Sequence, residues 1–181
     1  IHEQNQVPGL TNQWLSRIAR RVFQAFPNSF PASRGAETCG NPVRPEISAL
    51  AAPAERLGPR QGRTRLLVVG GSLGAQALNE QVAAAVALMP LDARPLIRHQ
   101  AGERTLEVAR QAYASARVEA EVTPFIRDMA EAYGWADLVI CRAGALTVSE
   151  LAAAGLGAIL VPYPSAVDDH QTANAAYLAD P

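Results

Sequence analysis

Residues 65–74 read RLLVVGGSLG, and the Ala-rich segment AQALNEQVAAAVAL follows at 75–88. The run RLLVV predicts a short apolar strand, the glycines predict a sharp turn, and the segment after them predicts a helix. A strand that turns through glycines into a helix is typical of a βαβ unit. This stretch decides the fold class, and the chain around it should continue as alternating strands and helices.

The chain beyond residue 88 continues that alternation. Short apolar runs predict strands at 95–99, 118–122, 137–141 and 158–162. Helical patterns lie between and after them, at 102–116, at 128–133, from Gly144 to Gly155, and from residue 168 to 178. Strands that alternate with helices form a parallel, doubly wound sheet. We therefore predict an α/β protein with a Rossmann-like parallel sheet.

Composition narrows the classes of function. The 181 residues carry 16 basic and 17 acidic side chains, a net charge of −1, which argues against nucleic-acid binding by bulk electrostatics. No run of about 18 apolar residues occurs, so no membrane-spanning helix is expected. All basic residues are Arg, which excludes a Schiff-base, P-loop or kinase lysine. Cys39 and Cys141 are far apart, form no metal-binding motif and fit a reducing cytoplasm.

The first 64 residues follow a different pattern. Apolar side chains recur at spacings of three and four within residues 11–26, which predicts an amphipathic helix that Pro27 ends: Trp14, Leu15, Ile18, Val22 and Phe26. Residues 27–64 are rich in Pro, Gly and small polar residues and indicate a domain junction, with a short helix around 46–57. The chain opens on IHEQN and closes on AAYLADP, so we expect an internal piece of a longer protein.

Three loops should lie at the carboxyl ends of the strands, where such sheets bind ligands. The first, residues 70–74, brings glycines to a helix start. Glycine lets the backbone approach a phosphate closely, and the helix N-terminus offers free N–H groups. The spacing G-G-S-x-G matches neither the dinucleotide fingerprint nor the P-loop, and a tight βα turn also carries glycine for geometry alone.

The second loop repeats the design, with Gly144 at a helix start, Arg142 before it and Glu150 one turn further on. A Glu near a helix N-terminus is explained by a favourable dipole interaction, or by hydrogen bonds to a ribose diol. Two glycine-bearing helix starts in one sheet favour a diphosphate ligand. In the third loop, Asp168 and Asp169 are helix caps or metal ligands, and His170 and Gln171 suit sugar hydroxyls or a solvated helix face.

Five segments carry a family resemblance: HEQNQVPGLTN (2–12), GNPVR (40–44), VVGGSLGAQALN (68–79), FIRDMAEAYGWADLVICRAGALTVSELAAAGL (125–156) and DDHQTANA (168–175). Together they resemble the MurG family of N-acetylglucosaminyltransferases of bacterial cell-wall synthesis. The resemblance implies a GT-B arrangement of two Rossmann-like domains. Residues 1–43 would be the remnant of an N-terminal acceptor domain with its linker, and residues 44–181 a C-terminal domain that binds the UDP-sugar donor.

The resemblance also implies an activity. A MurG-like enzyme transfers N-acetylglucosamine (GlcNAc) from UDP-GlcNAc, with inversion, to the muramoyl 4-hydroxyl of a lipid-linked acceptor. It requires neither metal nor cofactor, binds no nucleic acid, and works peripherally at the cytoplasmic face of the bacterial inner membrane. The alternatives are a nucleotide-sugar-binding module without catalysis, or a GT-B-type UDP-sugar 2-epimerase that shares the donor domain.

The residues that match the family's donor motifs can be named by their implied roles. Ser72 resembles the residue near the diphosphate, Leu146 and Thr147 the phosphate-side amide donors, and Glu150 the ribose carboxylate. Arg44 and the backbone of Ile126 resemble uracil contacts, and His170 and Gln171 resemble readers of the sugar hydroxyls. Arg142 and Asn79 match motif positions without a derived role. On the acceptor side stand Asn5 and Asn12.

The catalytic base is expected outside this segment, in a histidine-bearing glycine-rich loop that the family carries near its N-terminus. Within this chain, His2 and Glu3 are the nearest substitutes in sequence. We therefore expect the chain to bind UDP-GlcNAc weakly or not at all and to turn over little. Three arginines lie near two aromatic residues and suggest a contact with anionic lipid headgroups: Arg17, Arg20 and Arg21 beside Trp14 and Phe23. The alternative is a helix that packs its apolar stripe on its own sheet.

Overall fold

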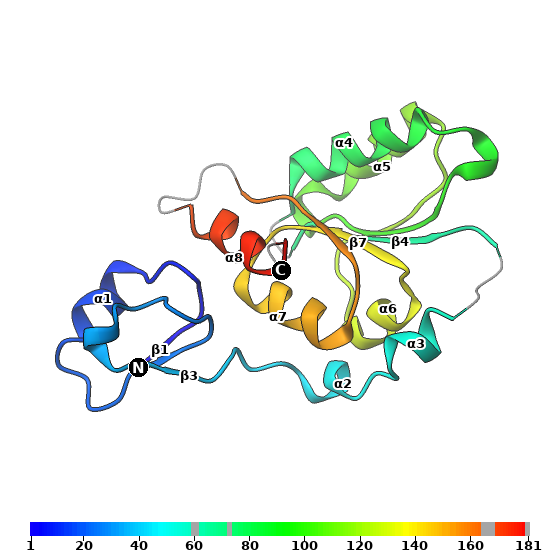
Figure 1. Cartoon of the computed structure of the whole chain (residues 1–181). Coiled ribbons are helices and arrows are strands. Elements are labelled where there is room, and N and C mark those ends of the chain that lie inside the picture. The colour runs from blue at the N-terminus through cyan, green and yellow to red at the C-terminus, as the bar shows by residue number, and fades with distance from the viewer. Residues whose placement is uncertain (59–61, 72–73, 164–168, 180–181) are drawn as a thin grey trace. The chain divides into compact units, whose positions relative to one another are not determined.

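The computed structural model describes residues 1–58, 62–71, 74–163 and 169–179 (Figure 1). The chain divides into two compact units. The first unit comprises residues 1–48, 143–153 and 160–181, and the second comprises residues 49–142 and 154–159. These two units are defined by contacts within the structure. The boundary predicted between residues 43 and 44 separates evolutionary domains instead, and it stays a prediction.

A five-stranded sheet has the order β6-β5-β4-β7-β8. Its strands are β4 (Arg65–Val69), β5 (Leu96–Gln100), β6 (Glu121–Thr123), β7 (Leu138–Cys141) and β8 (Ala158–Leu160). β4 pairs in parallel with β5 and β7, and β5 pairs in parallel with β6. The central strand β4 is the most deeply buried, with Leu67 and Val68 fully shielded from solvent. The predicted parallel α/β sheet is thus confirmed.

Helices of the second unit lie on both faces of this sheet. α4 (Gln76–Ala87) and α5 (Leu106–Ala116) lie side by side (Figure 1), and Tyr113 of α5 contacts His99 of β5. Arg98 points to the opposite face, where it stacks on Trp135 at the end of α6 (Met129–Trp135). This alternation follows from the two-residue period of a strand. The remaining short helices are α3 (Pro53–Arg56), η2 (Leu91–Ala93) and η3 (Glu103–Thr105).

The first unit contains a small parallel sheet and two longer helices. The strands β1 (His2–Glu3), β2 (Phe23–Gln24) and β3 (Glu37–Thr38) have the order β1-β2-β3, and the helices are α1 (Leu10–Leu15), η1 (Ala32–Arg34), α2 (Pro45–Ser48), α7 (Ala145–Ala154) and α8 (His170–Ala179). Phe26 is the centre of an apolar cluster with α7, and its ring meets Tyr177 of α8 edge-on at 4.9 Å. This cluster joins residues 1–48 to α7 and α8.

The helix predicted over residues 11–26 is wrong beyond Leu15. The chain turns after Leu15, where the Ser16 hydroxyl donates to the carbonyl of Gln13. Residues 23–24 then form β2 between β1 and β3. Val22 and Phe26 are buried, whereas Ile18 is exposed, so the apolar spacing does not mark one helix face. A strand pairing between distant segments decided the structure, and periodicity does not reveal such pairing.

Two other predicted elements differ in detail. The helix expected around 46–57 is two single turns, α2 and α3, because Pro53 disfavours helical geometry in the residue before it. The strand expected at 118–122 begins at Glu121, because α5 ends with Arg117 in the left-handed conformation (φ 52°) and residues 118–120 lead back to the sheet. The other predicted strands and helices lie within a few residues of those observed.

Candidate functional site

The glycine loop after β4 packs closely against the end of β5. The Gly70 amide donates to the carbonyl of Gln100 over 3.0 Å. Gly74 has a φ of +80°, and a Cβ atom there would overlap the Thr105 hydroxyl. Geometry alone therefore requires glycine at position 74. The predicted diphosphate residue Ser72, with Leu73, lies outside the described residues.

Asn79 holds a loop in place, a role that the sequence pattern did not predict. It is fully buried on α4, and its side-chain amide donates to the carbonyls of Ala101 and Thr105, each over 3.3 Å. These two carbonyls belong to the loop that follows β5. Asn79 thus fixes that loop against the first turns of α4, beside the glycine loop.

The loop between β6 and α6 holds the predicted base contact. The Ile126 amide donates to the side-chain oxygen of Gln100 over 3.1 Å. Ile126 lines a pocket of about 230 Å³ together with Thr123, Phe125 and Glu131, among others. Asp128 caps α6, accepting from the Glu131 amide over 2.8 Å, as its predicted place near the helix start requires.

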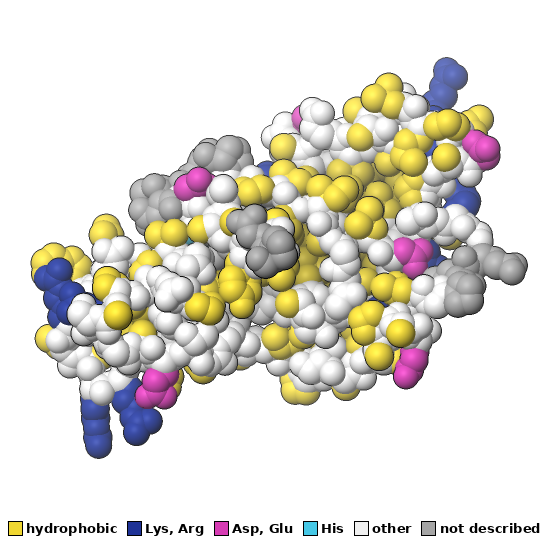
Figure 2. Space-filling view, in the orientation of Figure 1, with side chains coloured by type: hydrophobic (Ala, Val, Ile, Leu, Met, Phe, Trp, Pro, Cys, Tyr) yellow, Lys and Arg dark blue, Asp and Glu magenta, His cyan; other side chains and the backbone are white. Residues whose placement is uncertain are grey.

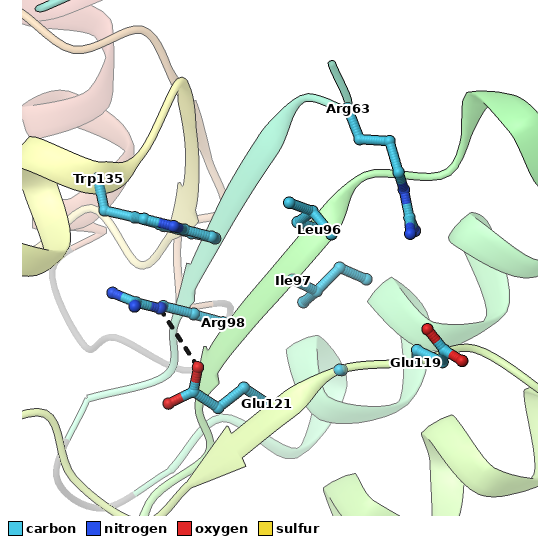
Figure 3. Close-up of a pocket in the computed structure, with 8 residues that line it drawn as sticks. Arg63, Leu96, Ile97, Arg98, Glu119, Glu121 and Trp135 are labelled. Carbon is cyan, nitrogen blue, oxygen red and sulfur yellow. Dashed lines mark ion pairs between the residues drawn. The ribbon is translucent and has the colours of Figure 1, made fainter.

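A larger pocket of about 480 Å³ lies beside the end of α6 (Figure 3). Arg98 and Trp135 lie one above the other there, with the guanidinium carbon 4.5 Å from the ring centre. Arg98 also pairs with Glu121 at 3.3 Å and with Glu131 at 2.8 Å. None of the residues predicted to bind the donor lines this pocket, so no sequence motif predicts it.

In the first unit, the structure brings together two predicted donor residues that are far apart in sequence. The guanidinium of Arg44 donates to both carboxylate oxygens of Glu150, over 2.9 and 3.1 Å. Such a bidentate pair fixes the plane of the carboxylate. Leu146 and Thr147 stand in the first turn of α7, one turn before Glu150. A carboxylate oriented in this way suits hydrogen bonds from a diol.

α8 begins with the two predicted sugar readers, His170 and Gln171. The side-chain oxygen of Gln171 accepts from the Tyr163 amide over 2.9 Å. One helical turn later, the fully buried Asn174 accepts from the Gln6 amide over 2.9 Å. It donates to the side chain of Asn5 over 3.1 Å and to the carbonyl of Ala143 over 3.2 Å. Asn174 therefore joins the start of α7 and the predicted acceptor-side loop to α8.

Glu3 organises the loop that follows β1. Its buried carboxylate accepts from the amides of Asn5 and Gly9 over 2.9 and 3.1 Å, and from the side chain of Asn12 over 2.8 Å. His2 lies with its Nε2 atom 3.0 Å from the carbonyl of Gly40. A carboxylate surrounded by donors of its own loop is suited to positioning. This placement favours a structural role for Glu3 over proton transfer.

The register of the large sheet relates two predicted anion loops to each other. Val69 is paired with Cys141, so Gly70 and Arg142 follow neighbouring strand ends at the same edge. This is the edge at which α/β sheets bind ligands. Among residues 1–58, 62–71, 74–163 and 169–179, no group of three His, Cys, Asp or Glu side chains could hold a metal ion. Within those same ranges, no helix combines the length and the apolar character needed to cross a membrane.

Known proteins resemble this chain over almost its whole length. A UDP-N-acetylglucosamine--N-acetylmuramyl-(pentapeptide) pyrophosphoryl-undecaprenol N-acetylglucosamine transferase from Marinobacter nauticus is 61% identical over 178 residues, 98% of this chain and 49% of that protein. A protein of the same name from Bordetella pertussis is 58% identical over 180 residues, 99% of this chain and 50% of that protein. The chain therefore spans about half the length of the relatives it matches.

A solved structure agrees with these sequences. The crystal structure of Acinetobacter baumannii MurG is 47% identical, has a TM-score of 0.85, and is matched over 99% of this chain and 50% of that one. The resemblance to MurG and the predicted fold class, a Rossmann-like sheet of a GT-B glycosyltransferase, are thus confirmed. The profile of the glycosyltransferase family 28 C-terminal domain matches residues 65–181, from β4 through α8, and the chain belongs to this family.

Proposed function

We propose that this chain is the donor-binding part of a transferase that moves GlcNAc from UDP-GlcNAc to the muramoyl 4-hydroxyl of undecaprenyl-pyrophosphoryl-MurNAc-pentapeptide. The observation that carries this proposal is the 61% identity, over 98% of the chain, to a relative whose name states that transfer. The names of the relatives also favour this activity over a UDP-sugar 2-epimerase. The alternative, a module that only binds nucleotide sugars, shares the donor binding that the titrations below measure.

The roles of individual residues are part of the proposal. Glu150, oriented by Arg44, binds the ribose diol, and Arg44 also lies against the base. Leu146 and Thr147 offer backbone amides to the phosphates, and Ser72 binds near them. The backbone of Ile126 contacts the base, and His170 and Gln171 read the sugar hydroxyls. Arg142 is a donor-side residue to which we assign no separate role, and Asn5 and Asn12 keep the acceptor-side loop in shape through Glu3.

The chemistry of this transfer is a displacement with inversion. The acceptor hydroxyl attacks the anomeric carbon of GlcNAc, the bond from that carbon to the phosphate oxygen breaks, and UDP leaves. Negative charge grows on the departing phosphate, where helix N-termini and backbone amides stabilise it. The hydroxyl proton passes to a general base, a role that we assign to none of the described residues.

Calorimetric titration of the chain with UDP-GlcNAc and with UDP tests the donor site. We expect weak binding that Glu150→Gln and Glu150→Ala reduce, because each removes a charged acceptor. Hydrogen bonds to a charged group contribute about 1.5–3 kcal/mol, so affinity should fall about 10- to 150-fold. The matched control is Glu107→Ala, which removes the same charge from an exposed position on α5.

Two results would count against the proposal. Equal affinity in the wild-type chain and both Glu150 variants would remove Glu150 from the site. Absence of binding to either uridine nucleotide, at concentrations up to the millimolar range, would refute donor binding by this chain. Reduced affinity in the Glu107 control would show that net charge, and not the position of Glu150, governs the interaction.

We further propose a peripheral contact with the anionic cytoplasmic face of a bacterial membrane. The contact surface is formed by α1 and the residues after it, where Trp14 is 65% and Ile18 is 83% exposed. Arg17 stacks on Trp14 with its guanidinium carbon 4.4 Å from the ring centre, and hydrophobic and basic side chains gather over this end of the unit (Figure 2). An apolar surface edged by arginines suits a headgroup layer.

Co-sedimentation with vesicles tests this contact. Each basic residue near an anionic surface contributes about 1 kcal/mol, so the double substitution Arg17→Gln with Arg20→Gln should weaken binding to anionic vesicles roughly 30-fold. The control pair Arg104→Gln with Arg110→Gln removes the same charge from exposed positions around α5. Binding that is unchanged by the first pair, or equally reduced by both, would remove the contact.

A further inference from the structure

The loop that carries Ile126 begins directly after the last residue of β6. β6 ends at Thr123, and the next residue is Pro124, which has no backbone N–H. The ladder between β5 and β6 stops at the pair formed by Gln100 and Thr123, where the Ala101 amide donates to the Thr123 carbonyl. Residues 124–128 must find their hydrogen-bond partners elsewhere.

Gln100 supplies such a partner. It is the last residue of β5 and is 4% exposed. Its side-chain oxygen accepts from the Ile126 amide over 3.1 Å, two residues beyond the end of β6. A side chain thus continues the hydrogen bonding beyond the end of the ladder.

The main chain of Gln100 is fixed at the same time. Its carbonyl accepts from the Gly70 amide over 3.0 Å, at the first residue of the glycine loop. Its register partner on the other side is Val69 of the central strand β4. One buried residue therefore connects the start of the glycine loop, through its backbone, to Ile126, through its side chain.

We propose that Gln100 is a positioning residue that determines base specificity, by holding the backbone of Ile126 in the orientation that recognises a uracil ring. This rests on the proposed function, in which the Ile126 backbone contacts the base of the donor. Uracil presents an N–H donor between two carbonyl oxygens, whereas cytosine presents an unprotonated ring nitrogen beside an amino group. Backbone groups distinguish these two edges only when the peptide plane is held in place.

The inference has two measurable parts, an ordered Ile126 amide and a preference for uracil. Gln100→Met keeps the length of the side chain and removes the acceptor. Gln100→Glu keeps an acceptor oxygen without a charge, because a carboxyl group buried here is neutral. The matched control is Gln111→Met, on the exposed face of α5. NMR measures the exchange rate of the Ile126 amide in each protein, and calorimetric titration measures the affinities for UDP and CDP.

We expect Gln100→Met to accelerate exchange of the Ile126 amide about 3- to 10-fold, the range for loss of one net hydrogen bond. The ratio of UDP affinity to CDP affinity should fall by a similar factor. Gln100→Glu should keep the slow exchange and most of the ratio, and Gln111→Met should match the wild type. A purely structural role would lower the thermal midpoint and leave the ratio unchanged.

The outcomes separate this inference from the proposed function. A wild-type chain that binds UDP with preference, and a Gln100→Met variant that keeps that preference, would overturn the inference alone. Tighter UDP binding by Gln100→Met would also overturn it, because the glutamine would then compete with the base for the Ile126 amide. A wild-type chain without preference for UDP would overturn both, and unchanged exchange at Ile126 in Gln100→Met would refute the hydrogen bond itself.

Discussion

Protonation of His99 should destabilise the second unit as the pH falls. The imidazole is fully buried, with Nδ1 2.9 Å from the hydroxyl of Tyr113. Burial lowers the pKa of His99 from 6.5 to about 4. The protonated ring carries an N–H on both nitrogens, and Nε2 is a buried atom that lacks a hydrogen-bond partner among the described residues. The folded state therefore strongly favours the neutral ring.

The sign and size of the effect follow from linkage. Between about pH 6.5 and pH 4 the unfolded chain binds a proton at this histidine and the folded chain does not, so the free energy of unfolding decreases as the pH falls. Stability from this group is fully present above the unfolded pKa. With a folded pKa of about 4, the loss is about 2 kcal/mol at pH 5 and about 3 kcal/mol at pH 4.

Urea unfolding at pH 7.5 and pH 5.0 measures this loss. Trp135, in a Trp14→Phe background, reports on the unit that contains His99. Carboxylates titrate in every variant. The decrease in the free energy of unfolding between pH 7.5 and pH 5.0 in His99→Gln is therefore subtracted from the same decrease in the parent protein. We expect a difference of about 2 kcal/mol. The control His170→Gln should behave like the parent, and an equal decrease in parent and His99→Gln would refute the reasoning.

Two further predictions concern packing. Gly74→Ala should lower the free energy of unfolding by more than about 2 kcal/mol, because the added Cβ meets the Thr105 hydroxyl and the Ala101 carbonyl at a positive φ. In urea unfolding, the double variant with Thr105→Ala should recover only the part of this loss that the Thr105 hydroxyl causes. Cys39 is exposed and should react at once with a thiol reagent, whereas Cys141 is buried with its pKa raised to about 12 and should react only when the protein opens. Equal reaction rates for the two thiols in absorbance assays would contradict this.

The large sheet was predictable because its signals are local. Strands β4, β7 and β8 are short, mainly apolar runs, and helical patterns lie between the strands, so the alternation in sequence is the alternation in space. The first unit was not predictable in this way. Its strands have two residues each and exist only through pairing with segments more than ten residues away, which is why Val22 and Phe26 were mistaken for helix positions.

The site was predictable only in part for the same reason. The glycine loops follow directly from strand and helix signals, and Asp128 was expected at the start of α6. The pairing of Arg44 with Glu150 joins residues 106 positions apart, and no local pattern encodes it. Family resemblance nominated both residues, and the structure shows them in contact, which periodicity and spacing alone would not have suggested.

Buried amide side chains are the residues that sequence reasoning missed most clearly, and their chemistry explains their positions. Each of three buried amides binds main-chain groups of a loop or helix start, where a ladder of backbone hydrogen bonds has ended: Gln100, Asn79 and Asn174. An amide offers both a donor and an acceptor without carrying a charge, so it satisfies such groups where a buried carboxylate or guanidinium would need a counter-charge. A signal did exist for Asn79. It lies on the stripe formed by Val82, Ala83 and Val86, and a polar residue on an apolar helix face indicates a buried hydrogen bond.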